Sequence, residues 1–379
     1  MLKVAFNAVP LLSPLTGIGQ YAKSLLQELD ADGSLVVDKF YAEGWSREVR
    51  QQGLSASAIK LKLLAQRFVP NSYALSRAVQ QHYFSSGARS FKPDVYHEPN
   101  FLAFKFDGPS VITVHDLSWI RYPEMHPIER VRAMDKYFEP GLRRAARIMT
   151  DSEFVKRELV EVFGVPPDRV HTVYLGVEPL FAPLQAHETA GVLSTHGLRH
   201  GSYWLAVGTL EPRKNLQLVL RAFMQLPQAD RRACPLILVG MKGWKTSALE
   251  QQIQPLIATG EVRQMGYISR EDLAVVMAGA RALVYPSVYE GFGLPPLEAM
   301  ACEVPVIASN VSSLPEVVGD AGLLIDPADE EGLAAHMRQL QEDTDLCKRL
   351  GAAALERSQR FSWARCAQET VGVYKAAVQ

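Results

Sequence analysis

The stretch EGFGLPPLE, residues 290–298, places two carboxylates eight positions apart, Glu290 and Glu298. Beside Glu290, two glycines on either side of a phenylalanine leave backbone N–H groups accessible to a ligand. Two adjacent prolines then stiffen the start of a predicted helix, and proline is tolerated there because the first N–H groups of a helix have no partner within it. Two acids and open amides together suit a ligand with phosphates and many hydroxyl groups, such as a nucleotide sugar. The alternative for Glu298 is a carboxylate in the first helical turn that only complements the helix dipole, a contribution of about 0.5 kcal/mol.

Two adjacent cations, Arg213 and Lys214, follow the apolar run YWLAVG (203–208) and precede another predicted helix. Such a pair beside a helix start suits a diphosphate. A solvated loop could carry the same two residues.

A glycine turn, TGIGQ at 16–20, follows the first predicted strand and opens a helix. Gly17 and Gly19 would let backbone N–H groups approach an anion. The dinucleotide-binding fingerprint is incomplete, because Tyr21 and Ala22 stand where a third glycine is expected. Tight packing of the turn is the alternative interpretation.

The glycines, cations and carboxylates described above all follow short apolar runs rich in β-branched residues, which we predict to be β-strands. The first series is 3–7, 94–98, 110–116, 147–152 and 170–176, and the second is 203–208, 235–240, 282–287 and 305–309. Segments of helical periodicity, such as 215–226 and 270–280, separate most of the runs. This alternation predicts an α/β fold with doubly wound parallel sheets, which bind ligands outside the carboxyl ends of their strands.

The two series flank residues 181–201, which lack a clear period and carry loop residues. We therefore predict two Rossmann-like domains facing a central cleft, over residues 1–180 and 202–361, with 181–201 as the linker.

The bulk composition excludes some classes of protein. A chain of 379 residues is comfortable for two domains, and a formal net charge of -1 argues against a protein that coats nucleic acid. The four cysteines lie far apart without a CxxC pair, so neither a zinc site nor a disulfide framework is indicated. No apolar run approaches the roughly 18 residues of a membrane span, and the start does not read as a signal peptide. We expect a cytoplasmic protein.

EGFGLPPLE resembles the E-x7-E element of glycosyltransferase family 4, the retaining enzymes of the GT-B fold. GTLEPRKN (208–215), VGMKGW (239–244), SSLPEVVGDAG (312–322) and the turn at TGIGQYA fall where that family has them. The resemblance covers nearly the whole chain. It implies a nucleotide-diphosphate-sugar donor on the C-terminal domain, an acceptor on the N-terminal one, and a last helix, residues 362–379, that packs back on the first domain.

The resemblance also implies roles for single residues. Glu298 would hold the ribose hydroxyls of the donor, and Glu290 would contact the hydroxyls of the donor sugar. Arg213 and Lys214 would neutralise the diphosphate as it leaves, where charge develops in the transition state. Some relatives have an arginine where this chain has Thr209, so the two cations would act without it. The other implied donor contacts are Gly17 and the backbone N–H groups of Phe292, Gly293 and Leu294.

His115, at the end of the run 110–116, matches the family's histidine near the donor sugar, although a strand-end histidine can be purely structural. Candidate acceptor contacts at the neighbouring strand end are His97, Glu98 and Asn100. The stretches TGIGQYAKSLLQEL, VYHEPNF and TVHDLS are similar to bacterial mannosyltransferases of O-antigen and polysaccharide assembly. We therefore expect a retaining hexosyltransferase that uses GDP-mannose. A UDP-, dTDP- or other GDP-sugar with a soluble acceptor is the alternative.

One segment bears on the acceptor. Between Val49 and Pro93 there is no acidic residue, but there are seven cations: Arg50, Lys60, Lys62, Arg67, Arg77, Arg89 and Lys92. A basic segment of this kind, 50–92, with interleaved apolar residues can lie on an anionic membrane surface, and a solvated helix pair is the alternative. The membrane interpretation implies a polyprenyl-diphosphate-linked oligosaccharide as acceptor and a peripheral location on the inner face of the plasma membrane.

No metal and no other cofactor is expected. The D-x-D pair in DAD, 30–32, follows a predicted helix rather than a strand, and the spaced pair His196 and His200 lies in the predicted linker. A phosphorylase of the same fold would need a Schiff-base lysine for pyridoxal phosphate, and no lysine of the second domain has supporting context. A non-catalytic sugar-nucleotide-binding regulator is the other rival, although none of the motifs is degraded.

Overall fold

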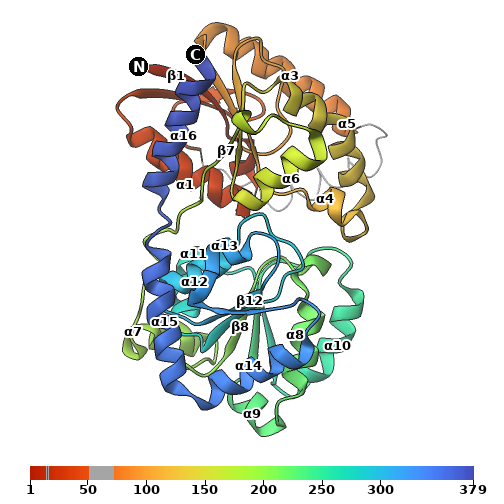
Figure 1. Cartoon of the computed structure of the whole chain (residues 1–379), viewed down its shortest axis with the longest axis vertical. Helices are drawn as coiled ribbons and strands as arrows, with labels where there is room; N and C mark the ends of the chain where they lie inside the picture. Colours follow the sequence, from red (N-terminus) through yellow and green to blue (C-terminus); the bar gives the residue numbers. More distant parts are fainter. Residues whose placement is uncertain (14, 16, 51–71) are drawn as a thin grey trace. The chain divides into compact units, whose positions relative to one another are not determined.

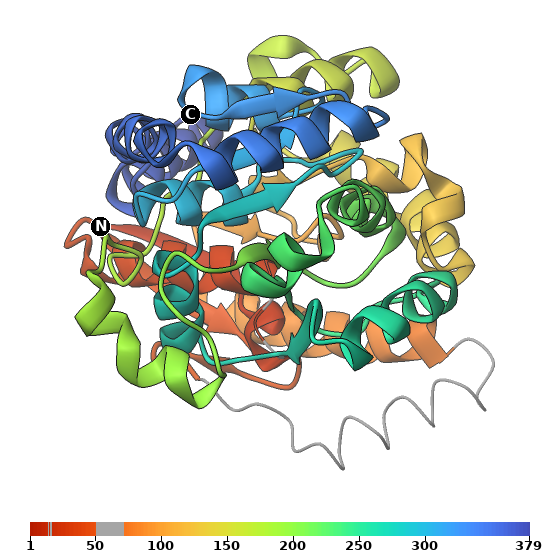
Figure 2. The ribbon, with the colours of Figure 1, turned by 90° about the horizontal axis from the view of Figure 1, so that it is seen from below.

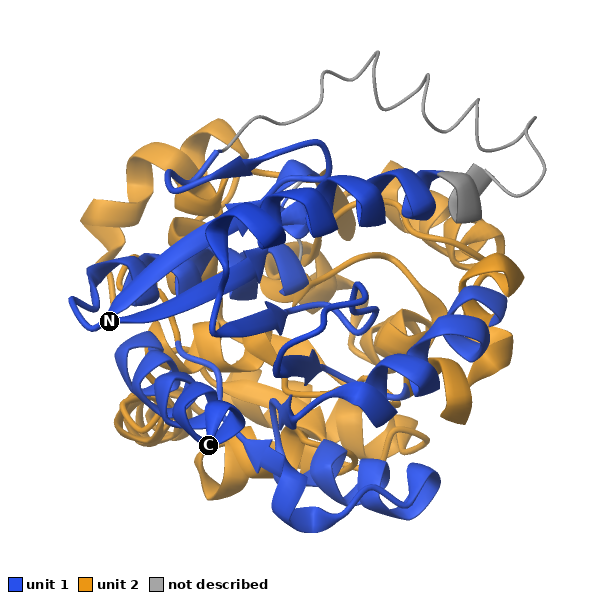
Figure 3. Cartoon of the chain, turned by 90° about the horizontal axis from the view of Figure 1, so that it is seen from above, with its two compact units in different colours: residues 1–117, 132–176, 363–379 blue, residues 118–131, 177–362 orange. Residues whose placement is uncertain are grey.

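The computed structural model describes residues 1–13, 15, 17–50 and 72–379 of the chain. The chain divides into two compact units, of which unit 1 comprises residues 1–117, 132–176 and 363–379, and unit 2 comprises 118–131 and 177–362 (Figure 1 and Figure 3). Each unit contains one mainly parallel sheet covered by helices. The α/β class and the parallel sheets predicted from the sequence are confirmed.

The sheet of unit 1 has seven strands in the order β3-β2-β1-β4-β5-β6-β7. Only β3 is antiparallel to its neighbour. The bounds are β1 Leu2–Asn7, β2 Leu35–Phe40, β3 Trp45–Ser46, β4 Val95–Glu98, β5 Ser110–Val114, β6 Arg147–Thr150 and β7 Val170–Thr172. In this sheet β2 pairs with one side of β1 and β4 pairs with its other side, so the strand order reverses its direction at β1. The carboxyl ends of β1 and β4 therefore form the topological switch point of this unit.

The helices of unit 1 cover both faces of its sheet. Those formed by described residues are α1 Gly17–Ala31, α3 Ser72–Phe91, α5 Ile128–Arg144, α6 Glu153–Phe163 and α16 Trp363–Val378, with the 3-10 turns η1 Val9–Leu12 and η3 Pro167–Arg169. α5 begins in unit 2 and passes into unit 1 after Val131. The last helix, α16, packs on α1 and on β4, β5 and β6 (Figure 1). Its residues Trp363 and Tyr374 are buried there, so the end of the chain completes the core of unit 1.

The sheet of unit 2 has six parallel strands in the order β10-β9-β8-β11-β12-β13. The bounds are β8 Trp204–Val207, β9 Leu236–Val239, β10 Val262–Gly266, β11 Ala282–Tyr285, β12 Val306–Ser309 and β13 Leu323–Ile325. Here the switch point lies between the carboxyl ends of β8 and β11. Both units therefore have the strand order of dinucleotide-binding folds.

The helices of unit 2 form two layers (Figure 1 and Figure 2). α8, α10 and α14 share one apolar core with strand residues such as Trp204 and Leu238, and α12 packs against α11, α13 and α15. The bounds are α4 Ser118–Arg121, α7 Ala186–Thr195, α8 Leu216–Met224, α9 Gln228–Ala233, α10 Ser247–Ala258, α11 Arg270–Ala278, α12 Leu294–Ala301, α13 Leu314–Val318, α14 Glu330–Glu342 and α15 Thr344–Ser358, with η2 Pro123–Met125, η4 Pro212–Lys214 and η5 Gly319–Ala321.

Residues 181–201 differ from the linker that we expected. They contain α7, which belongs to unit 2 and packs on α11. A capping box between Gln185 and Glu188 starts this helix, and its residues Thr189 and Leu193 are buried. A narrow buried stripe on a ten-residue helix gives too weak a period to be recognised in sequence.

Candidate active site

Two loops meet at the switch point of unit 2. One follows β8 and carries Arg213 and Lys214, and the other follows β11 and carries Glu290. The guanidinium of Arg213 donates to the carbonyl oxygen of Tyr289 over 2.7 Å, and the amide of Val288 donates to the carbonyl of Arg213 over 3.0 Å. Groups that are 77 positions apart in sequence are therefore held beside each other, as the strand-end argument predicted.

Glu290 lies between the two cations. Arg213 Nη1 donates to one carboxylate oxygen over 2.8 Å, and Lys214 Nζ donates to the other over 2.6 Å. The second guanidinium nitrogen of Arg213 donates to Glu211 over 2.6 Å. Lys214 also donates to the hydroxyl of Tyr285 over 2.5 Å. The cluster thus contains two positive and two negative charges and is neutral as a whole.

Burial makes these charges interact strongly. Burial by itself disfavours the carboxylate of Glu290, but Arg213 and Lys214 outweigh it and lower the pKa of Glu290 to about 2. Burial also lowers the pKa of Lys214, against the opposing effect of Glu290 and with the help of neighbouring Arg213. A diphosphate oxygen can take the place of a carboxylate oxygen as the partner of either cation.

Two glycines hold the loop after β8 in place. Gly208 has φ 142° and Gly240, after β9, has φ 147°. A Cβ on Gly240 would lie 1.9 Å from the carbonyl oxygen of Gly208, so no larger residue fits. The amide of Leu210 then donates to the carbonyl of Met241 over 2.9 Å. This close approach gives a physical reason for the glycines in the two motifs and fixes the loop that presents Arg213.

Ser312 and Ser313 form hydrogen bonds with the backbone of the loop after β11. The hydroxyl of Ser313 donates to the carbonyls of Glu290 and Phe292, and Ser312 Oγ accepts from the amide of Glu290 over 3.0 Å. Gly293 precedes α12 with φ 112°, and a Cβ there would lie 2.7 Å from the side chain of Leu314. Leu294 is the first residue of α12, so its N–H belongs to the group that has no partner within a helix.

Glu298 lies one residue further into α12 than we expected and so falls just beyond its first turn, because the helix begins at Leu294 and not at Pro295. The first-turn prediction is wrong, and the helix dipole alone explains this residue less well. Its carboxylate is buried and accepts from Arg270 Nη2 over 2.6 Å. Burial raises the pKa of Glu298, and Arg270 opposes that rise.

The sequence reasoning missed Arg270 and its other partners. Arg270 is the first residue of α11, after β10, and its Nε donates to Glu178 over 2.8 Å. The guanidinium also lies 4.3 Å from the ring centroid of Phe181. Arg270 thereby joins Glu298 to the chain segment that enters unit 2 at Val177. The available signal was a cation directly after the N-cap residue Ser269, at the first position of the predicted helix 270–280.

The candidate donor contact in unit 1 is Gly17, the first residue of α1. Gly17 is exposed, and a Cβ built on it would meet nothing within 4 Å. Gly19 is different, because its Cβ would come 3.0 Å from the side chain of Leu15. Packing therefore accounts for Gly19 but not for Gly17.

The switch point of unit 1 holds Glu98. Asn7, at the end of β1, donates to its carboxylate over 2.8 Å, and the hydroxyl of Tyr96 donates over 2.6 Å. The amide of Asn100 donates to the other oxygen over 3.0 Å. Burial raises the pKa of Glu98 to about 7, although these hydrogen bonds oppose the rise.

The two candidate site histidines of unit 1, His97 and His115, have both ring nitrogens engaged. His97 is 0% exposed and bonds to the hydroxyls of Tyr374 over 2.6 Å and Thr113 over 2.8 Å. Burial lowers the pKa of His97 to about 3, so the ring is neutral. The structure thus gives His97 a core role and does not present it to an acceptor.

His115 lies directly after β5 and is also buried. Its Nδ1 lies 2.7 Å from Asp151, and its Nε2 donates to the carbonyl of Pro99 over 2.7 Å. Burial lowers the pKa of His115, but Asp151 outweighs that effect and raises it overall. His115 would have to give up one of these two hydrogen bonds before a ring nitrogen could bond to a ligand.

The remaining candidates have local partners. In DAD, Asp30 pairs with Lys39 over 2.7 Å, and Asp32 caps the amide of Ser34 over 2.8 Å. His200 bonds to Thr189 over 3.1 Å. No group of three or more potential metal ligands occurs among residues 1–13, 15, 17–50 and 72–379.

The basic segment 50–92 lies partly outside the described residues, which exclude 51–71. In its described part, Arg77 on α3 donates to the carbonyl of Ala103 over 2.6 Å and stacks over Phe104 and Tyr137. Arg77 therefore has a packing role. In the part of the chain that the structure describes, no helix is long and apolar enough to cross a membrane.

Comparisons with known proteins agree with this fold. The sucrose-phosphate synthase of Thermosynechococcus elongatus has a TM-score of 0.79 at 22% identity, covering 99% of this chain and 98% of that one. WaaG, a glycosyltransferase involved in lipopolysaccharide biosynthesis, has a TM-score of 0.74 at 16% identity, with coverage of 98% and 99%. The two Rossmann-like units thus define a GT-B fold.

Sequence similarity gives the family. Residues 15–179 match the family described as Glycosyltransferase Family 4, and residues 200–357 match the one described as Glycosyl transferases group 1. The chain is 38% identical to the O-antigen chain mannosyltransferase B of Escherichia coli, covering 99% of this chain and 100% of that protein. The chain therefore belongs to the family of GT-B glycosyltransferases that includes this mannosyltransferase, and it is an enzyme that transfers a sugar.

Proposed function

We propose that the protein is a retaining mannosyltransferase that moves mannose from GDP-mannose onto a polyprenyl-diphosphate-linked oligosaccharide in O-antigen or related polysaccharide assembly. The observation that carries the transfer chemistry is the cluster of Arg213, Lys214 and Glu290 at the β8/β11 switch point. The choice of mannose is supported by the 38% identity over the full chain to a mannosyltransferase of O-antigen chains.

The donor diphosphate would bind to Arg213 and Lys214. Without a donor, Glu211 and Glu290 neutralise the two cations. The carboxylate of Glu290 has further lone pairs beside those used by the cations, and these can accept hydrogen bonds from the hydroxyls of the donor sugar. Glu298 would accept from the ribose hydroxyls, with Arg270 as a positioning residue behind it. No metal is needed in this scheme, because the cations supply the counter-charge.

The transfer step breaks the bond between C1 of the sugar and the diphosphate oxygen, and the electron pair leaves with the diphosphate. The acceptor hydroxyl oxygen bonds to C1 on the same face, and its proton passes to an oxygen of the departing diphosphate. The leaving group gains one negative charge in this step, and the two buried cations stabilise that charge. No separate general base is required, and the product keeps the anomeric configuration of the donor.

The acceptor would bind to unit 1, where Glu98 ends β4 at the switch point and Asn100 follows it, while Gly17, the first residue of α1, would contact the donor diphosphate. A lipid-linked acceptor would place the enzyme at the inner face of the plasma membrane. The cations of the basic segment 50–92 support that location through their charge alone.

The proposal is tested with the purified protein and a panel of GDP-mannose, UDP-glucose, UDP-galactose and dTDP-rhamnose. GDP-mannose should raise the melting temperature most, since ligand binding stabilises the folded state by mass action. NMR of the product formed on a mannose-terminated lipid-linked acceptor should then give the same anomeric configuration as the donor. Stabilisation and turnover with a UDP- or dTDP-sugar only, or an inverted anomeric centre, would overturn the donor assignment or the retaining scheme respectively.

A further inference from the structure

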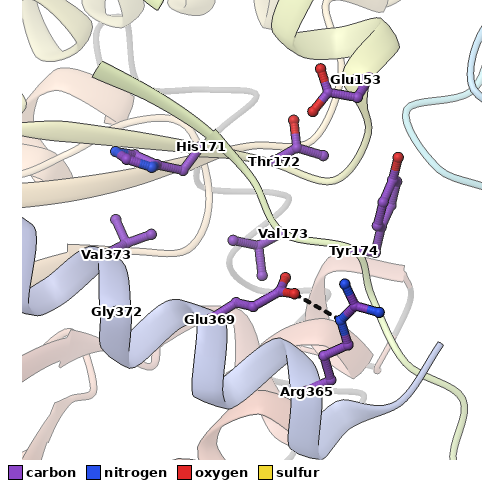
Figure 4. A pocket seen from close by; sticks show the side chains of 9 residues that line it. All are labelled: Glu153, His171, Thr172, Val173, Tyr174, Arg365, Glu369, Gly372 and Val373. Atoms are coloured by element: carbon purple, nitrogen blue, oxygen red, sulfur yellow. Dashed lines mark hydrogen bonds and ion pairs between the residues drawn. The ribbon is translucent and has the colours of Figure 1, made fainter. Parts of the chain in front are cut away.

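A cavity of about 320 Å³ lies within unit 1, between β7 and α16 (Figure 4). Thr172, Val173 and Tyr174 line it from the end of β7, and Arg365 and Glu369 line it from α16. Its volume falls in the range of small-molecule sites, which starts at about 300 Å³. The strands β5 and β6 separate β7 from β4 in the sheet, so the cavity is a different place from the β1/β4 switch point where the acceptor contacts are proposed.

The cavity has buried polar atoms that the protein leaves without a partner. Thr172 and His171 both line the cavity, and within the described residues the hydroxyl oxygen of Thr172 and Nε2 of His171 are buried without a hydrogen-bond partner. Burial lowers the pKa of His171, and Arg147 and Lys156 act in the same direction, so its ring is neutral. Each unsatisfied buried group of this kind costs about 1–3 kcal/mol. A rotation that turns either side chain toward the cavity would let a ligand hydroxyl group remove that cost.

The remaining lining residues fit a neutral polyol better than an ion. Arg365 and Glu369 already form a pair over 2.8 Å, visible as the dashed line in Figure 4. Glu153 adds a second carboxylate to the lining, so the cavity is not suited to an anion. Val173 and Val373 give apolar surface beside the polar groups. Sugar hydroxyls both donate and accept, while the C–H faces of a pyranose pack on valine and tyrosine.

We propose that this cavity is a second saccharide site, which binds one or two sugar units of the acceptor or product glycan. Its ligand follows from the proposed function, in which the acceptor is an oligosaccharide. A glycan held here would raise the local concentration of its reacting end at the transfer site. The site would therefore lower the KM for long acceptors and leave kcat and the KM for the donor unchanged.

Gly372 provides a variant that fills the cavity. It lines the cavity from α16, and a Cβ built on it would meet nothing within 4 Å. Gly372→Leu should therefore fold and should project its side chain into the cavity, since leucine also has the better helix propensity. Gln368→Leu is the matched control, because Gln368 is exposed on the same helix and does not line the cavity.

The probe is the methyl glycoside of an α-linked mannose tetrasaccharide, titrated into the full-length protein and followed by NMR. We expect the wild type and Gln368→Leu to bind it equally and Gly372→Leu to bind it about tenfold more weakly, a difference of about 1.4 kcal/mol. Equal binding by Gly372→Leu and wild type, or no binding by wild type, would overturn the proposal. The titration needs no donor, so a wrong donor assignment would leave this result unaffected.

Thr172→Val is an independent variant that separates a binding role from a structural one. Removing an unsatisfied buried hydroxyl should raise the melting temperature of the free protein, while the loss of one hydrogen bond to the glycan should weaken binding about fivefold. A structural role for Thr172 would instead lower the melting temperature. A higher melting temperature with unchanged glycan affinity would also contradict the proposal. In transfer assays the KM should rise for a tetrasaccharide acceptor and stay constant for a monosaccharide glycoside.

Discussion

Replacing Glu290 with glutamine would remove one negative charge from a buried, neutral cluster while keeping the shape of the side chain. In the contacts described above, Arg213 would then keep Glu211 as its carboxylate partner, and Lys214 would keep the hydroxyl of Tyr285. The side chains of Arg213 and Lys214 are only 14% and 12% exposed, so water cannot compensate fully. We expect Glu290→Gln to destabilise unit 2 and to lower turnover more than it lowers nucleotide affinity, since the proposed partner of Glu290 is the sugar.

The pKa of Glu290 gives the magnitude of the free energy by which its carboxylate stabilises the fold. It is about 2 in the fold, against 4.5 for a free glutamate, and each pKa unit corresponds to about 1.4 kcal/mol. The carboxylate therefore contributes about 3 kcal/mol at pH 7. Because the folded pKa is the lower one, this stability is fully present above pH 4.5 and is lost as the pH falls toward 2. At pH 3.5 the same two pKa values leave about 2 kcal/mol.

The assay is urea unfolding of the full-length protein at pH 7 and at pH 3.5, followed by far-UV circular dichroism. Glu330→Gln is the control, because Glu330 also pairs with an arginine, Arg221, but at the surface. An exposed pair of this kind adds little to stability. The reasoning fails if Glu290→Gln costs no more than the control at pH 7, or if its cost is the same at both pH values.

The other predictions follow from the same contacts. Glu298→Ala should weaken binding of the free nucleoside diphosphate and should also destabilise unit 2, because it removes a partner of the buried Arg270; unchanged affinity in calorimetry would exclude the ribose role. Arg270→Met should weaken binding of the nucleoside diphosphate about tenfold, a loss of about 1.4 kcal/mol. Arg270 has no proposed contact with the donor, but Glu298 would lose the partner that positions it. Turnover should persist in excess EDTA, and activity that returns only with added magnesium or manganese would refute metal-independence. Deleting everything after Phe361 should abolish transfer and also unfold unit 1, which hydrogen exchange would detect, because α16 buries Trp363 and Tyr374 there.

Most strands could be predicted because they are buried on both faces and read as apolar runs. Four strands could not be predicted, and two of them have clear causes. β2, LVVDKF, contains a lysine that is fully buried, since Lys39 is 0% exposed. Its ammonium group can be buried because it donates hydrogen bonds to Asp30 and to the carbonyl of Arg47. β10, VRQMG, is the edge strand of its sheet, and its alternating exposure gives a mainly polar sequence. A rule based on apolar runs misses strands of both kinds.

The site was only partly predictable for a different reason. The strand-end rule placed Arg213, Lys214 and Glu290 correctly together, because the carboxyl ends of neighbouring parallel strands must meet. The rule says nothing of which side chains turn inward. His97 turns into the core of unit 1, where α16 supplies its partner Tyr374 from 277 positions away. Partners at such a distance in sequence leave no local pattern.

The spacing of the two acids in EGFGLPPLE follows from the elements around them. Eight positions place Glu290 in the loop, within reach of the cations that follow β8, and place Glu298 one turn inside α12, within reach of the arginine that begins α11. Each acid is thus paired with a cation from another strand end before any donor arrives. Donor binding would then exchange one set of charge-assisted hydrogen bonds for another instead of desolvating bare charges, and its cost would be correspondingly lower. The prolines and Gly293 fix the start of α12, so the distance between the two acids is set by the fold and not by the ligand.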